Sequence, residues 1–237
     1  MSNQILVTLP TTPPQPLLGF TTTSPVTAHS SPLHPSSPPI ALSNPLSPVS
    51  KWLGIPYGTA QRFAAPEPFI STDHGATREC YEFGTTPLQN LGAMEPFWVG
   101  KEGWLDRDWV GMGEDCSSLN IFRPEGYELK KGELLPVMVW IYGGALNTGH
   151  SAAVRHDATE LVRQSEKEGK PCIVVTSNYR VNIFGFLSHP DLSACDPSGV
   201  SGNYGFHDQI LMLKWVKNYI SLFNGDPSQV TVFGESA

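Results

Sequence analysis

The stretch Gln229-Val-Thr-Val-Phe-Gly-Glu-Ser-Ala237 decides the fold class of this chain. It opens with a run rich in β-branched and apolar residues that stops at Gly234, which predicts a buried β-strand followed by a turn. Ser236 stands two residues after that glycine. A serine on a sharp turn at the carboxyl end of a strand, beside tiny residues, is typical of a catalytic nucleophile. Gly-x-Ser alone is a weak pattern, so it is the place after a strand that makes Ser236 a candidate.

Two other apolar runs have the same character. Residues 136–142 stop at Gly143-Gly144, and residues 172–178 form a second run that is almost free of charge. Unbroken apolar strands are typical of a parallel sheet that is covered on both faces. Shorter runs at residues 52–57 and 119–122 also predict strands.

Amphipathic stretches lie between these runs and predict helices. Residues 158–168 carry apolar side chains on one side. Residues 208–223 repeat apolar side chains at spacings of three and four, namely Leu211, Trp215, Val216, Tyr219, Ile220 and Phe223. Asn224-Gly-Asp-Pro227 ends the second helix. The alternation of strand and helix predicts the α/β class with right-handed crossovers.

The first fifty residues differ from the rest of the 237-residue chain. They contain no Asp, Glu, Lys or Arg, and half of the 22 prolines. Proline fixes φ and removes a backbone donor, so we expect an extended arm, with a weak hairpin formed by residues 5–9 and 17–22. The sequence therefore predicts a division into an arm (residues 1–50) and a folded part (residues 51–237).

Composition excludes several classes of protein. The formal net charge of −7 gives no basic surface for nucleic acid. The longest apolar runs are too short to span a bilayer, and the N-terminus lacks the basic and apolar regions of a signal peptide, so we expect a cytoplasmic protein. The cysteines form no CxxC pair and no zinc-ligand spacing, which predicts free thiols and no metal site; they are Cys80, Cys116, Cys172 and Cys195.

A second glycine-rich turn suggests what Ser236 would work with. Tyr142-Gly-Gly-Ala145 follows an apolar strand, and small residues let backbone N–H groups approach a substrate oxygen. The N–H groups of Gly144, Ala145 and Ala237 would form a three-donor oxyanion hole. The alternative is that Gly143-Gly144 is simply a tight turn.

Together these stretches resemble the type-B carboxylesterase family, which includes cholinesterases and lipases of the α/β-hydrolase fold. The resemblance covers about residues 52–237 in the order of the family. Its stretches are GIPY at 54–57, RF at 62–63, EDCSSLNI at 114–121, PVMVWIYGGA at 136–145, VTSNYR at 175–180, FGFL at 184–187, GNYGFHDQ at 202–209, LKWV at 213–216 and FNGDPSQVTVFGESA at 223–237.

The resemblance implies a role for each matching residue. Ser236 would be the nucleophile of a Ser-Glu-His triad, with Gly144, Ala145 and Ala237 as oxyanion donors, although the family more often has a third glycine in place of Ala145. No cofactor is implied, and the substrate would be a small-molecule ester.

The resemblance also implies structural roles. Arg62 and Glu114 would form a buried ion pair. Cys116 matches a cysteine that is disulfide-bonded in secreted members; its partner would fall near Pro87, from which Cys80 is displaced, so we expect no disulfide.

The triad is incomplete in this sequence. In α/β-hydrolases the order is Ser, then acid, then His, and all seven histidines precede Ser236. His207 at a helix start and His150 after the oxyanion turn are poor candidates for the base. An aromatic side chain among Trp98, Trp104 and Trp109 would line the substrate gorge, or these residues would only pack their loop.

We therefore expect an N-terminal part of an α/β-hydrolase fold from a serine ester hydrolase, inactive by itself. Two alternatives stay open: a non-catalytic binding module of the same fold, and a truncated product without function. In the truncated product the strand that ends at Phe233 would have an exposed edge, which favours aggregation, whereas a well-behaved monomer would favour the module. The sequence does not determine the acyl specificity, the alcohol specificity or the oligomeric state.

Overall fold

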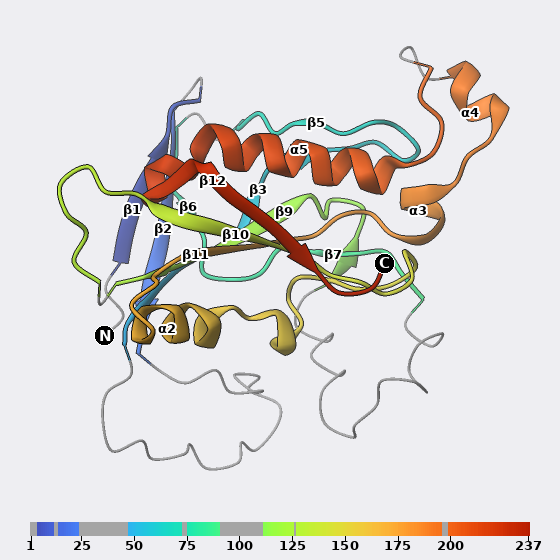
Figure 1. The fold of residues 1–237 in the computed structure, drawn as a ribbon. Coiled ribbons are helices and arrows are strands. Elements are labelled where there is room, and N and C mark those ends of the chain that lie inside the picture. Colours follow the sequence, from blue (N-terminus) through green and yellow to red (C-terminus); the bar gives the residue numbers. More distant parts are fainter. Residues whose placement is uncertain are drawn as a thin grey trace.

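One mixed sheet forms the centre of the molecule (Figure 1). The computed structural model describes residues 4–11, 14–23, 47–72, 75–90, 111–125, 127–195 and 199–237. Along the sheet the strands are β1 (Gln4–Leu9), β2 (Gln15–Thr22), β3 (Val49–Pro56), β9 (Ser118–Pro124), β11 (Ile173–Ser177), β10 (Leu135–Ile141) and β12 (Gly225–Gly234), with β6 (Arg78–Glu79) paired to β2. Two short pairs stand apart, β4 (Gly58–Thr59) with β5 (Glu67–Pro68) and β7 (Thr86–Pro87) with β8 (Met112–Gly113).

The three long apolar runs form the parallel part of this sheet, as predicted. The expectation that all three are buried is wrong for β12, in which only Gly225 is buried. β10 is parallel both to β11 and to β12. All five residues of β11 are buried, which accounts for its unbroken apolar sequence. The last residues of β10 and β12, Ile141 and Gly234, are partners in the register. The turns that follow these two strands therefore leave the sheet at the same edge.

The N-terminal strands are antiparallel to one another and continue the same sheet. β1 and β2 form the predicted hairpin, and β2 pairs with β3, which in turn pairs with β9. Leu17 of β2 is fully buried in the main core. The division of the chain into an arm and a folded part stays a prediction; its boundary at residues 50 and 51 falls within β3.

Helices cover both faces of the sheet (Figure 1). On one face α5 (Tyr204–Tyr219) continues into the 3-10 helix η4 (Ile220–Phe223) and packs Trp215 and Phe223 against Trp52 of β3. On the other face α2 (Thr159–Lys167) buries Val162 against Phe122. The connections contain η3 (Val154–His156), α3 (Asn182–Phe186) and α4 (Pro190–Cys195). The structure thus confirms the predicted α/β arrangement.

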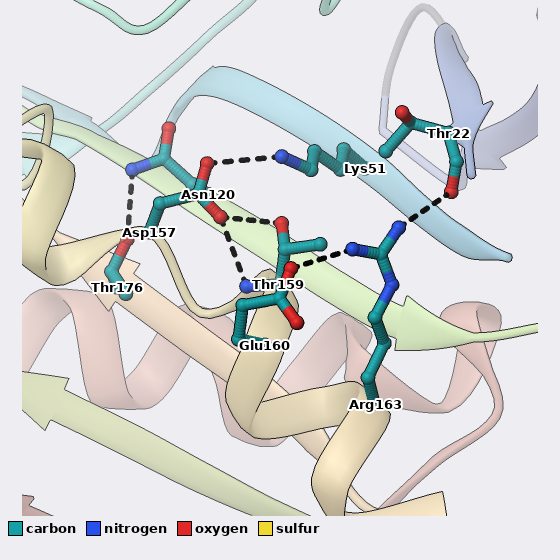
Figure 2. Close-up of polar contacts among 8 residues, drawn as sticks. All are labelled: Thr22, Lys51, Asn120, Asp157, Thr159, Glu160, Arg163 and Thr176. Carbon is teal, nitrogen blue, oxygen red and sulfur yellow. Dashed lines mark hydrogen bonds and ion pairs between the residues drawn. The ribbon is translucent and has the colours of Figure 1, made fainter. Parts of the chain in front are cut away.

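A network of charged side chains joins α2 to the N-terminal strands (Figure 2). Lys51 of β3 donates to Asp157 at 2.9 Å, and Asp157 accepts the backbone N–H of Thr159 in the first turn of α2. The buried guanidinium of Arg163 donates to the carbonyl oxygens of Ser47 and Thr22. The helix is therefore attached to β2 and β3 by polar contacts as well as by packing.

None of the helices within the described ranges has the length and apolar composition needed to cross a bilayer.

Candidate active site

The turn after β12 carries the predicted nucleophile. Ser236 is exposed and has a φ of 61°, in the left-handed region that a residue with a side chain rarely adopts. Such strain persists where the surrounding structure fixes the backbone, and it is concentrated at functional sites. The prediction that Ser236 lies on a sharp turn at the end of a strand agrees with this geometry. Its catalytic role stays a prediction.

The turn after β10 lies directly against this serine. A Cβ atom placed on Gly143 would come within 2.2 Å of the Glu235 carbonyl oxygen and 2.8 Å of the Ser236 Cβ. Only glycine fits such a close approach of two backbones. The second glycine is needed as well, because Gly144 has a φ of 145° and its Cβ would meet the Thr148 carbonyl oxygen at 2.2 Å.

Backbone N–H groups of this turn point at one oxygen atom. Gly144 and Leu146 both donate to the Ala237 carbonyl oxygen, each at 2.9 Å. Among the described residues nothing accepts the N–H of Ala145. The structure therefore brings the predicted donors Gly144, Ala145 and Ala237 together, but here the Ala237 carbonyl faces the donors. The sequence does not point to Leu146, because the direction of its N–H depends on the positive φ of Ala145, 56°.

A pair of stacked tyrosines lies where the glycine turn begins. Tyr142 and Tyr179 stack with ring centroids 4.4 Å apart, and each hydroxyl donates to the carbonyl of the other residue. Both side chains are almost fully buried. Because Tyr142 directly follows β10 and Tyr179 lies two residues after β11, the pair fixes the starting point of the turn relative to the sheet.

Two histidines lie near the turn, and burial keeps both neutral. Desolvation lowers the pKa of His150 and of His156 to about 4. His156 bonds the His150 carbonyl at 2.9 Å through Nδ1 and packs against the rings of Tyr142 and Trp140. In the described part of the chain no imidazole or carboxylate is hydrogen-bonded to the Ser236 hydroxyl. His150 and His156 therefore have structural surroundings rather than those of a base.

Other predicted residues are placed as follows. His207 lies in the first turn of α5, where its N–H donates to the Asn203 carbonyl. The residues Trp98, Trp104, Trp109, His29, His34 and His74 lie outside the described residues, as does the Cys195 side chain.

The Arg62–Glu114 ion pair is present, but the expectation that it is buried is wrong. The two side chains are 55% and 36% exposed. Arg62 stacks over the ring of Phe184, and both members line the rim of a small pocket that is open to solvent. Water therefore reaches both members of the pair.

The three cysteines whose side chains the structure describes have buried, protonated thiols. Cys80, Cys116 and Cys172 are unpaired, and burial raises the pKa of Cys80 and of Cys116 to about 12. Cys116 and Pro87 line the same small pocket. No group of three or more metal-ligating side chains occurs within the ranges that the structure describes.

Comparisons with known proteins agree with this geometry. A sequence model of the carboxylesterase family matches residues 40–237. The chain belongs to the carboxylesterase family. It is similar to Lipase 4 of Diutina rugosa, with 39% identity over 199 residues that cover 78% of this chain and 34% of the lipase. It is also similar to the inactive carboxylesterase-like protein VdtD of Byssochlamys spectabilis, with 36% identity over 79% of this chain and 30% of that protein.

The structural comparison gives the same family. A thermophilic PNB esterase superposes with a TM-score of 0.70 at 32% identity, over 99% of this chain and 39% of the esterase. The fold is thus that of the α/β-hydrolase esterases, as the resemblance implied. The chain spans about a third of the length of the two curated relatives, 34% and 30%.

Proposed function

We propose that this carboxylesterase-family chain supplies the nucleophile and the oxyanion hole of a serine ester hydrolase that acts on small-molecule esters. The supporting observation is the contact between the strained Ser236 turn and a glycine turn whose N–H groups converge on one oxygen. In this mechanism the Ser236 Oγ attacks the ester carbonyl carbon while its proton passes to a base. The alcohol then leaves, and water hydrolyses the acyl-enzyme.

The oxyanion would be held by the N–H groups of Gly144, Ala145 and Ala237. Donors aimed at the developing negative charge are the largest single source of stabilisation in many acyl transfers. That two N–H groups reach the Ala237 carbonyl oxygen, each at 2.9 Å, supports the view that this turn can hold an oxygen. The proposal requires that the carbonyl turn away, so that the N–H of Ala237 joins the donors instead.

We further propose that none of the 237 residues is the general base. His156 bonds the His150 carbonyl and stacks on Tyr142, and among the described residues neither imidazole is hydrogen-bonded to Ser236. A serine without a base is a poor nucleophile. These residues by themselves should therefore not turn over an ester through Ser236.

Covalent labelling tests the nucleophile. A fluorophosphonate reagent is added to the polypeptide that carries this sequence, purified from its native source, and the labelled peptide is identified by mass spectrometry. We expect a single modified serine, Ser236, and no labelling of a Ser236→Ala variant. Labelling at a different serine would contradict the proposal.

Turnover by residues 1–237 tests the absence of a base. The initial rate with a p-nitrophenyl ester of a short acid should be the same for the chain and for its Ser236→Ala variant. A rate that falls on this substitution would show that a base is present among these residues.

A non-catalytic binding module is the second candidate, because one relative of similar coverage is named an inactive carboxylesterase-like protein. The labelling experiment separates the two functions: a native polypeptide in which Ser236 stays unmodified and no ester is hydrolysed would favour the module.

A further inference from the structure

The glycine turn belongs to a longer loop, residues 143–151, which lies alongside the segment 85–89. Three residues, Gln89, Asn178 and Asn182, join the two. Gln89 and Asn178 do so through their side chains, and Asn182 through its side chain and its backbone N–H. These residues are far apart in the sequence, and none of them belongs to the predicted nucleophile or oxyanion hole. We call them the amide clamp.

Gln89 holds the second half of the loop through two hydrogen bonds to one residue, Gly149. Its Nε2 donates to the Gly149 carbonyl oxygen at 2.9 Å, and its Oε1 accepts the Gly149 N–H at 2.7 Å. This reciprocal pair fixes the orientation of the Gln89 carboxamide. The opposite orientation would place the side-chain NH2 against the Gly149 N–H and the side-chain oxygen against the Gly149 carbonyl. Gly149 has no room for a side chain, because its Cβ would lie 2.4 Å from the ring of Tyr142.

The two asparagines hold the loop at its last residue and near its middle. The Asn178 side chain accepts the Ser151 N–H at 2.8 Å and donates to the Thr85 carbonyl at 2.9 Å. Asn182 donates its backbone N–H to the Leu146 carbonyl and its side-chain amide to the Leu88 carbonyl, both at 2.7 Å. Each asparagine therefore contacts both segments at once.

The loop needs such support because its backbone is strained. Ala145 and Leu146 have φ values of 56° and 57°, and each residue in this region costs about 1–2 kcal/mol. A strained conformation persists only when the surroundings fix it. A buried amide group that loses its partner is itself destabilising, so each bond of the clamp opposes relaxation of the loop.

We propose that the amide clamp positions the oxyanion donors, and that Gln89 is the positioning residue. Its hydrogen bonds fix the distance between the glycine turn and Ser236. The inference rests on the proposed ester hydrolysis at Ser236. The clamp touches neither the serine nor a substrate. It acts by holding the loop that presents the N–H of Gly144, so its loss should weaken binding of the transition state more than binding of the ester.

Two substitutions at one position separate this role from general packing. Gln89→Leu removes both hydrogen bonds with Gly149. Gln89→Glu turns a carboxylate oxygen toward the Gly149 carbonyl, and this contact raises the pKa of the new carboxyl. When protonated, that carboxyl both donates and accepts, as the amide does. Gln89→Glu should therefore be defective at pH 7.5 and recover at pH 5, whereas Gln89→Leu should be defective at both.

The first readout is hydrogen exchange in the 237-residue chain, which does not depend on catalysis. We expect the amides of Leu146 and Gly149 to exchange about tenfold faster or more in Gln89→Leu, with recovery of Gln89→Glu at pH 5. The matched control is Gln164→Leu on the exposed face of α2, which should leave these amides unchanged. Unchanged exchange in Gln89→Leu overturns the inference whatever the function of the protein.

The second readout is ester hydrolysis by the native polypeptide, as kcat per fluorophosphonate-labelled serine, which corrects for misfolded molecules. We expect Gln89→Leu to lower kcat by about 10-fold to 100-fold, as a small misplacement of a catalytic group does. KM should change by less than about threefold, because the interaction lost is made in the transition state. If Gln89→Leu does not fold, Gln89→Glu carries the test through its recovery at pH 5.

The outcomes distinguish the inference from the function on which it rests. An active wild type in which Gln89→Leu keeps its kcat, or in which Gln89→Glu does not recover at pH 5, overturns the clamp alone. A wild type that neither hydrolyses esters nor labels at Ser236 overturns the proposed function and the clamp with it.

Discussion

Strained residues gather at one point of the molecule. Ala145 and Leu146 face Ser236 across the close contact made by Gly143, and all three non-glycine residues have positive φ values between 56° and 61°. A single left-handed residue is an ordinary device of a turn. Three of them on two facing turns indicate that the backbone is held for a purpose other than stability.

Ala145 offers a direct test of this strain at the residue scale. Ala145→Gly removes the Cβ that is disfavoured at positive φ, and the gain outweighs the added freedom of the unfolded chain. We expect the free energy of unfolding to rise by about 0.5–1 kcal/mol, measured by urea denaturation. The control is Ala60→Gly, at a residue that does not have a positive φ, which should lower it. A loss of stability in Ala145→Gly would show that the loop is not strained there.

At the scale of elements, the attachment of α2 to β3 depends on a buried ion pair. The side chains of Lys51 and Asp157 are only 10% and 13% exposed, so removing one partner leaves a charge that is largely shielded from water. We expect Lys51→Met and Asp157→Asn each to lower the free energy of unfolding by about 3 kcal/mol or more, and the double variant to lose much less than their sum.

The exposed pair Arg62–Glu114 is the matched control for this cycle. Because its side chains are 55% and 36% exposed, Arg62→Met and Glu114→Gln should show a much smaller coupling. Equal coupling energies for the two pairs, measured by urea denaturation of both double-mutant cycles, would contradict the view that burial makes the Lys51–Asp157 pair strong.

The sequence predicts those elements whose pattern repeats along the chain. β10, β11 and β12 are continuous apolar runs, and the α5 region shows helical spacing, so local patterns suffice for them. The start of α5 was predicted at Asp208 but lies at Tyr204, because Asn203 takes a left-handed conformation and its carbonyl accepts the N–H groups of the first turn. Asn203 is of a type that is favoured at an N-cap, but its side chain forms no capping hydrogen bond.

The candidate site also contains some residues that the sequence predicts and others that only the fold reveals. Ser236 and the glycine turn are visible as short motifs, because close backbone approach demands small residues at fixed positions. The amide clamp is not visible, since Gln89, Asn178 and Asn182 are brought together only by the fold and bond backbone groups rather than one another. The exposure of Arg62 is likewise a property of the final surface, which no local pattern encodes.

At the scale of the whole molecule, two buried histidines make stability depend on pH. Burial lowers the pKa of His150 and of His156 to about 4, below the value of about 6.5 in an unfolded chain. The unfolded chain therefore binds more protons between these values. The stabilising contribution is complete above pH 6.5 and is lost as the pH falls toward 4, on the order of 3 kcal/mol for one site.

His150→Phe should flatten this dependence, because the His150 Nδ1 is buried without a hydrogen-bond partner among the described residues. The measurement is urea denaturation at several pH values between 4.5 and 7.5. These cover most of the range between the folded and unfolded pKa of the histidines. The exposed His189 provides the control, and His189→Phe should keep the wild-type slope. A slope that is the same in all three proteins would exclude His150 as its source.

The outer edge of β12 has no partner strand in the described sheet. β12 has ten residues and pairs with β10 alone, and its Val232 side chain is 48% exposed. Unpaired backbone groups beside apolar side chains form a template for another strand, and natural proteins oppose such pairing with charged residues. The 237-residue chain should therefore associate as its concentration rises, which light scattering and analytical ultracentrifugation can follow.

A charge on this strand should weaken the association. We expect Val232→Lys to shift the association to concentrations about tenfold higher or more, because a lysine on an edge strand disfavours pairing with a second strand. Leu161→Lys is the matched control, since it makes the same change of charge at a side chain that is 41% exposed on α2, on the opposite face of the sheet from α5. If both variants reduce association equally, net charge rather than the edge of β12 governs it, and a chain that stays monomeric at high concentration would show that this edge is protected.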